Sequence, residues 1–241
     1  VRLSLLLLCF TGLEAQPPGL DSLLNVLQTG TLSVEQQLET YDKICSRYTN
    51  YDLDKLVGYA EGGLELCEKA KDKSFAARFN NHLGVASMFK GEHDKAMPYY
   101  EKALDQALRS DDKLQQAIVY GSMGSSMNLQ SRYEEALEYD MKALSLFEEL
   151  GNKKQTILAL VNIGSTHNAM FNTERSIYYF EKAETLANEI NDKSGQMHAS
   201  YYLGGIYRDK GDMDKSMEYN LQTVELSREL GNRQAEILSL Q

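Results

Sequence analysis

The sequence has few of the features that mark linkers, membrane spans and nucleic-acid binding. It contains three prolines, two of them adjacent at Pro17 and Pro18, and no stretch rich in serine and glycine, so no domain boundary is indicated. The formal net charge is −10 without any basic stripe, which argues against direct contact with nucleic acid by this segment. An apolar run from Leu3 to Phe10 is too short to span a bilayer, which takes about 20 residues.

Catalytic signatures are also missing from the sequence. It has no glycine-rich phosphate loop, no GxSxG and no CxxC motif. The histidines are not spaced four apart, as the helical zinc motif requires, and they stand at positions His82, His93, His167 and His198. We therefore predict no catalytic residue, no metal site and no cofactor, and we do not expect an enzyme.

Cysteine is scarce, and the two cysteines beyond the N-terminal run are badly placed for a disulfide. If Cys45 and Cys67 lie on antiparallel helices that turn near Asn50, they are separated by about 18 Å along the hairpin. A disulfide requires Cα atoms within about 7 Å. The spacing predicts two buried thiols.

What the sequence has in abundance is internal repetition. Gly84, Gly124, Gly164 and Gly204 are each forty residues apart, and each follows a large apolar residue. Further columns keep the same register: a small residue twelve positions after the glycine, a tyrosine fifteen after it, and alanine or threonine nineteen after it. These are Ala96, Ala136, Ser176 and Ser216; Tyr99, Tyr139, Tyr179 and Tyr219; and Ala103, Ala143, Ala183 and Thr223.

Each repeat predicts a helical hairpin. Apolar and small residues recur at helical spacing over residues 75–89 and 93–109, with Lys90 and Gly91 between them. An acidic residue follows the turn in every copy, where the helix dipole favours it: Asp94, Glu134, Glu174 and Asp214. The second helix ends each time at residues suited to a left-handed cap, beginning at Asp111, Gly151, Asn191 and Gly231. The repeated glycine is expected at a close helix crossing, and the tyrosine column is expected to pack between hairpins.

The pattern of Leu83-Gly84, Ala96, Tyr99-Tyr100 and Ala103 resembles the tetratricopeptide repeat (TPR). The resemblance covers residues 31–241 and implies an all-α superhelical solenoid of antiparallel helix hairpins. The period of forty exceeds the usual length of about 34, and the proline that commonly closes the repeat is absent. The longer form is similar to the repeats of bacterial peptide-sensing regulators and of animal polarity adaptors.

The chain is expected to comprise three parts. Residues 1–15 resemble a secretory signal peptide cut after Ala15; a membrane anchor and a buried helix are alternatives, and a lipoprotein signal at Cys9 is disfavoured by Leu8. Residues 16–30 form a tail and a short capping helix. The TPR array follows, with a divergent first repeat that has Ile44 in the glycine column and a truncated sixth repeat, which predicts that the sequence belongs to a longer protein. The repeats span about 31–71, 72–111, 112–151, 152–191, 192–231 and 232 onward.

The TPR resemblance implies a concave groove lined by the first helix of each hairpin. Amides recur there, because Asn128 and Asn168 share one column and Asn162 stands in another, and such amides would pair with the backbone of an extended peptide. The alternative, that they are solvated surface or contact the next helix, stays open. The Lys and Asn arrangement of chaperone-binding TPR clamps is not matched. The candidate groove residues are Arg78, Asn81, His82, Val85, Met88, Phe89, Ser125, Asn128, Asn162, Ser165, Asn168, His198, Tyr201, Tyr202 and Arg208.

The sequence thus favours a module that binds a protein or peptide. It resembles the N-terminal extracytoplasmic TPR region of Bacteroidetes-type sensor regulators, which implies export to the periplasm and a signalling output further along a longer chain. Membrane contact is expected only through the leader or a missing downstream anchor, and a homodimer is compatible with the pattern. The alternatives are a stand-alone exported scaffold for envelope protein assembly and, if the leader is not functional, a cytoplasmic peptide-sensing adaptor.

Overall fold

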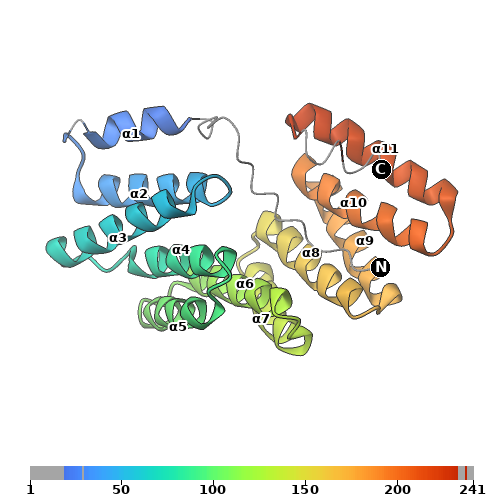
Figure 1. Ribbon diagram of the computed structural model, residues 1–241, viewed down its shortest axis with the longest axis horizontal. Coiled ribbons are helices and arrows are strands. Elements are labelled where there is room, and N and C mark those ends of the chain that lie inside the picture. Colours follow the sequence, from blue (N-terminus) through green and yellow to red (C-terminus); the bar gives the residue numbers. More distant parts are fainter. Residues whose placement is uncertain (1–18, 29, 233–236, 238–241) are drawn as a thin grey trace.

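The computed structural model describes residues 19–28, 30–232 and 237, and within them every regular element is an α-helix. Eleven helices follow one another around an open arc, with α1 and α11 at its two ends (Figure 1). They are α1 (Leu20–Gln28), α2 (Val34–Tyr48), α3 (Leu53–Ala70), α4 (Ala76–Phe89), α5 (His93–Arg109), α6 (Lys113–Leu129), α7 (Tyr133–Glu149), α8 (Lys153–Ala169), α9 (Thr173–Glu189), α10 (Lys193–Asp209) and α11 (Met213–Leu230). The predicted all-α solenoid of helix hairpins is confirmed.

The helices pair as α2/α3, α4/α5, α6/α7, α8/α9 and α10/α11, and we call the first member of each pair the A helix and the second the B helix. The helices predicted over residues 75–89 and 93–109 are α4 and α5, and the short helix α1 covers part of the expected N-terminal cap. The predicted leader, residues 1–15, and all of the predicted sixth repeat except Asn232 and Ile237 lie outside the described residues. No helix in the described ranges is both long enough and apolar enough to cross a membrane.

Every joint after a B helix uses a left-handed residue, as the sequence predicted, and so do the turns between A and B helices from the second repeat on. After the B helices the left-handed residues are Lys71, Asp111, Gly151, Asn191 and Gly231. The next backbone N–H then closes the helix end; that of Asp192, for example, donates to the carbonyl of Ala187 at 2.9 Å. The side chains of Asp112 and Asn152 cap the following A helix by accepting from the backbone N–H groups of Gln115 and Gln155.

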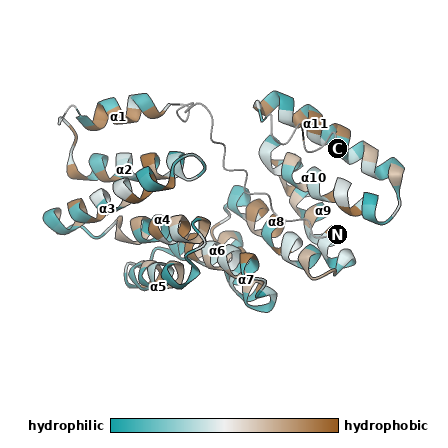
Figure 2. Cartoon of the chain, viewed as in Figure 1, coloured by the Kyte–Doolittle hydropathy of each residue, from teal (hydrophilic) through white to brown (hydrophobic). Residues whose placement is uncertain are grey.

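The core runs the length of the array between A and B helices. Hydrophobic and hydrophilic residues alternate along each helix rather than separating into whole apolar helices (Figure 2). The tyrosine column is half-buried against this core. Its ring contacts lie within one hairpin rather than between hairpins as predicted; Tyr219 on α11, for instance, stacks on Tyr207 of α10 with ring centroids 5.7 Å apart. Cys45 and Cys67 are buried free thiols, as predicted.

The repeated glycine lies at the closest approach of the two helices in a hairpin. A Cβ added to Gly84 would come within 2.5 Å of the Tyr100 ring, and one added to Gly164 within 2.9 Å of the Phe180 ring. The residue that meets the glycine always follows it by sixteen positions. In the divergent first repeat the volumes are exchanged: Ile44 takes the glycine column and its partner position is Ala60, both fully buried in one cluster. Three hairpins thus place one large and one small side chain at the crossing, and in the other two Asp140 and Asn220 face the glycine.

The Gly164→Leu variant is expected to unfold with a free energy lower by more than about 2 kcal/mol, because the fully buried Phe180 ring leaves no room for it. Urea denaturation measures this loss. Gly121→Ala is the control, since a Cβ there meets nothing within 4 Å; it should be neutral or stabilise by up to about 1 kcal/mol through helix propensity. Equal stability of Gly164→Leu and wild type would contradict the proposed crossing.

One crossing holds a carboxyl group where its neighbours hold aromatic rings. Asp140 on α7 packs directly on Gly124 and is 1% exposed. Burial raises the pKa of Asp140 from its usual 3.8 to about 8, and the Asn162 side chain on α8 opposes the shift without completing a well-formed hydrogen bond to either oxygen. The carboxyl is therefore neutral in the folded protein at pH 7.

Asp140 should make the fold less stable as the pH rises. The folded state keeps this proton up to a pKa of about 8 whereas the unfolded state loses it near 3.8, so the unfolding free energy should fall between these values by up to about 1.4 kcal/mol per pH unit. Asp140→Asn removes the titration. Urea denaturation of both proteins from pH 5 to 8 tests this, and a difference in stability that does not change with pH would show that Asp140 is already ionised in the folded state.

Candidate functional site

The A helices form the inner side of the curved array. Each A helix contacts the A helix of the next repeat, as α4 does α6 and α8 does α10. No comparable contact joins successive B helices in the described part of the chain. Since the A helices are closer together than the B helices, the array bends toward them, and their open side is the concave face that the sequence predicted would carry the groove.

The candidate residues share one stripe of the A helices but differ in accessibility. Asn168 and Arg208 are exposed, whereas Asn81 and Met88 are buried and offer a ligand little surface. Met88 is used internally, because its sulfur lies 3.7 Å from the Tyr100 hydroxyl, which donates to it. The remaining candidates are partly exposed: Arg78, His82, Val85, Phe89, Ser125, Asn128, Asn162, Ser165, His198, Tyr201 and Tyr202.

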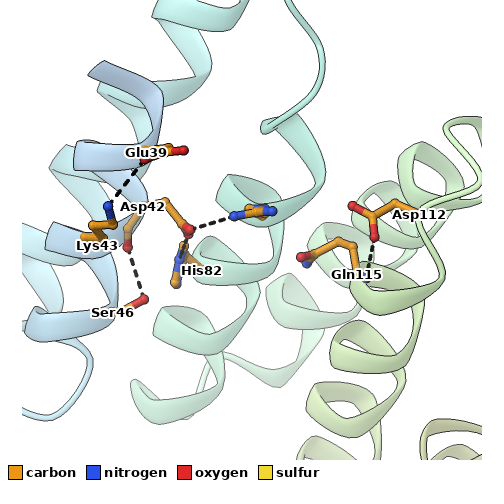
Figure 3. A network of polar contacts seen from close by, with 8 residues as sticks. Glu39, Asp42, Lys43, Ser46, His82, Asp112 and Gln115 are labelled. Carbon is orange, nitrogen blue, oxygen red and sulfur yellow. Dashed lines mark hydrogen bonds and ion pairs between the residues drawn. The ribbon is translucent and has the colours of Figure 1, made fainter. Parts of the chain in front are cut away.

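At the N-terminal end of the face, two candidates pair with a residue that we did not predict. Asp42 on α2 receives a hydrogen bond from His82 Nε2 at 2.8 Å and another from the Arg78 guanidinium at 3.2 Å (Figure 3). Burial alone would raise the pKa of the Asp42 carboxyl, but His82 and Arg78 outweigh burial and hold it below its usual value. Asp42 stands forty residues before His82, so the repeat register contained the signal that would have found it.

A shallow pocket of about 490 Å³ adjoins this cluster. Four carboxylates and two basic side chains line it, together with Ser74 and Phe75. The charged residues are Glu35, Glu39, Asp42, Asp112, Lys43 and Arg78. The N-terminal end of the inner face is therefore strongly charged, with an acidic excess.

The amides in the middle of the face do not all remain available. Asn128 Nδ2 donates to Thr166 Oγ1 on the next A helix at 2.6 Å, so this amide ties two repeats together. Asn162 lies beside Asp140. Asn168 is exposed, and its side chain makes no hydrogen bond to any other described residue. The predicted ladder of amides thus contains one free amide and two that contact neighbouring residues of the chain.

The C-terminal end of the face combines aromatic side chains with the exposed Arg208. Tyr201 meets Tyr202 edge to face with centroids 5.5 Å apart, and Tyr202 stacks on Phe180 at 4.7 Å. Burial lowers the pKa of His198 although the nearby Asp192 charge opposes this, so its ring is neutral at pH 7. Aromatic side chains in such an arrangement supply rigid contact area for a ligand.

The described residues contain no group of three or more His, Cys, Asp or Glu side chains arranged to hold a metal ion. The candidates therefore offer hydrogen bonds, charge and aromatic surface.

A curved array of helix hairpins with a polar and aromatic inner face defines a helical-repeat interaction module. The tetratricopeptide repeat model matches the sequence over residues 75–149 and 115–189. Residues 75–189 thus carry tetratricopeptide repeats, a fold that serves protein interaction. No curated protein shows significant sequence similarity to the chain.

Solved structures share the fold at low sequence identity. BtubC (BKLC) from P. vanneervenii is 16% identical, with 88% of each chain covered and a TM-score of 0.68. Aspartyl phosphate phosphatase F from Bacillus subtilis is 19% identical with a TM-score of 0.69, and the match covers 88% of this chain and 56% of the phosphatase chain. A Rap protein complexed with Competence and Sporulation Factor is 17% identical with a TM-score of 0.76, and the match covers 90% of this chain and 60% of the Rap chain. This chain thus spans little more than half of the latter two proteins.

Three amide truncations should separate structural from available side chains. Asn128→Ala is expected to lower the unfolding free energy by about 1 kcal/mol, because Thr166 loses its hydrogen bond. Asn168→Ala should stay within about 0.5 kcal/mol of wild type, as should Asn188→Ala, which removes an exposed amide from the B helix of the same repeat. Urea denaturation decides between them, and equal losses for Asn128→Ala and Asn168→Ala would contradict the assignment.

Proposed function

We propose that the chain binds an extended peptide, or an extended segment of a protein, along the inner face of the A helices. The observation that carries this proposal is the exposed, unbonded amide of Asn168 between a charged end at Asp42 and an aromatic end at Tyr201 and Tyr202. An amide both donates and accepts, so it can pair with a peptide backbone whatever the side chains are. The Rap protein structure, which contains a bound factor, supports this use of the fold.

The two ends of the face would give the ligand a direction. A basic side chain of the peptide fits the acidic pocket near Asp42, where carboxylates outnumber basic groups. An apolar or aromatic side chain fits beside Tyr201 and Tyr202. The central polar residues Ser165 and Asn168 would contact the backbone between them.

The proposal extends to the setting of the module. The leader-like residues 1–15 and the resemblance to sensor regulators support a module exported to the periplasm that forms the input part of a longer signalling or transcription regulator. Filling the inner face would change the curvature of the array, and this change would be the signal. The proposal assigns the chain no catalytic step. A stand-alone envelope scaffold is the second candidate, and it shares the same face without the output.

Peptide binding is tested with a random peptide library selected against the purified chain. The best peptide should bind with a dissociation constant that rises about tenfold or more in Asn168→Ala and stays unchanged in Asn188→Ala, measured by isothermal titration calorimetry. Both variants truncate one exposed amide of the same repeat, on opposite helices. Failure to select any peptide, or equal affinities for both variants, would overturn the groove assignment.

The setting requires a separate measurement. N-terminal sequencing of the protein from its source should find Gln16 as the first residue if the leader is cut after Ala15. The source gene beyond Gln241 should then encode an apolar segment of about 20 residues followed by an output domain. An intact Val1–Ala15 segment would favour the cytoplasmic adaptor, and a stop codon after one or two further helices would favour the scaffold.

A further inference from the structure

One turn between an A and a B helix carries a side chain that does nothing for the fold. Phe171, between α8 and α9, is 92% exposed. Its φ is +58°, in the left-handed region that L side chains rarely adopt and that is an outlier for a bulky residue. A buried aromatic ring stabilises a protein, but this one contributes neither burial nor a favourable backbone conformation.

The other repeats show what the turn itself requires. The same position is Gly91 in the second repeat, Ser131 in the third and Gly211 in the fifth, all with positive φ. The hydrogen bonds of the turn are the same as well: Phe171 N–H donates to the Asn168 carbonyl at 3.0 Å, as Gly91 N–H does to the Met88 carbonyl. Glycine therefore fits this turn without any change of backbone. Phenylalanine at this position therefore costs the fold stability, and backbone strain of this kind is concentrated at functional positions.

Apolar exposure continues at the corresponding turns of the adjacent repeats. Leu129 precedes the turn of the third repeat and is 36% exposed, and Met213 follows the turn of the fifth repeat and is 60% exposed. Because equivalent turns of a solenoid recur along one edge, these residues flank Phe171 on the same edge of the array. Leu129 stands forty residues after the inner-face candidate Phe89, so this edge adjoins the inner face of the A helices.

We propose that Phe171 is the anchor of a second interaction surface and that it inserts into an apolar pocket of a folded protein partner. Protruding aromatic side chains that fill a pocket typically dominate the energy of such interfaces. Leu129 and Met213 would contact the rim of the pocket on either side.

The features of the chain favour a different protein over a second copy of the chain or a membrane surface as the partner of Phe171. A second copy is a poor receptor, because the pockets beside α2 are charged, being lined by Asp42 and Lys43 with further acidic or basic side chains. A membrane surface is disfavoured because a single ring gives weak insertion and because the net charge of −10 repels anionic lipids.

The partner is found by photo-crosslinking and the anchor is tested by titration. The full chain carrying benzoylphenylalanine at position 171, or at position 131 as the matched turn position, is irradiated in an extract of the source cells. We expect a protein product from position 171 that position 131 does not yield. That protein is then purified and titrated with wild type, Phe171→Gly and Ser131→Gly.

Phe171→Gly should weaken its binding about tenfold or more while Ser131→Gly leaves it unchanged. The urea midpoint of Phe171→Gly should stay the same or rise, because glycine suits the left-handed turn, so lost binding would not reflect lost folding. Products that are only lipids or a second copy of the chain, no product, or equal affinity of all three proteins would overturn the proposal. The peptide selected for the inner face should bind Phe171→Gly as it binds wild type, which keeps failure of either surface distinguishable from failure of the other.

Discussion

The array depends on one steric constraint, which is that the two helices of each hairpin cross so closely that one of them must offer almost no side chain. Gly84 and Gly164 satisfy it by facing the rings of Tyr100 and Phe180, and the first repeat satisfies it in reverse with Ile44 and Ala60. What the repeats share is therefore one small residue at the crossing rather than glycine itself, and the residue that faces it varies from Tyr100 and Phe180 to Asp140 and Asn220. This explains why a first repeat without the glycine still pairs its helices, and why the array tolerates different residues opposite it.

That constraint is local in sequence, and so the fold could be predicted. The helices, their turns and the left-handed caps all depend on residues within about twenty positions of one another, and a period of forty repeated these signals four times. The site could be predicted only in part. Which side of the helices faces inward follows from the register, but whether Asn128 is free or donates to Thr166 depends on how far one repeat is rotated against the next. The curvature of the array sets that rotation, and no single repeat encodes it.

The inner face shows the same division between what the register sets and what tertiary structure decides. Forty-residue spacing brings Asp42 and His82 into one column, and because their helices are adjacent the two side chains form a half-buried hydrogen bond. At the other end the column contains Tyr202, whose ring instead stacks on the B-helix residue Phe180. Residues at this repeat position thus join neighbouring helices at both ends, and the exposed amide of Asn168 lies between the two ends on the inner face. In a stable solenoid most inner side chains must contact the neighbouring repeat, since each repeat contacts only its neighbours.

Departures from the repeat pattern are most informative where they lower stability. Asp140 occupies the crossing position that is Tyr100 and Phe180 in the adjacent repeats, and burial there keeps the carboxyl protonated at neutral pH. Phe171 occupies the turn position that is Gly91 in the second repeat and Gly211 in the fifth, and it gains no burial in return. The two departures differ in kind. A buried group such as Asp140 can act only through the stability or curvature of the array, whereas a side chain fully exposed at its edge can act only on another molecule. Exposure therefore separates a residue that tunes the scaffold from one that contacts a partner, even when both break the same repeat.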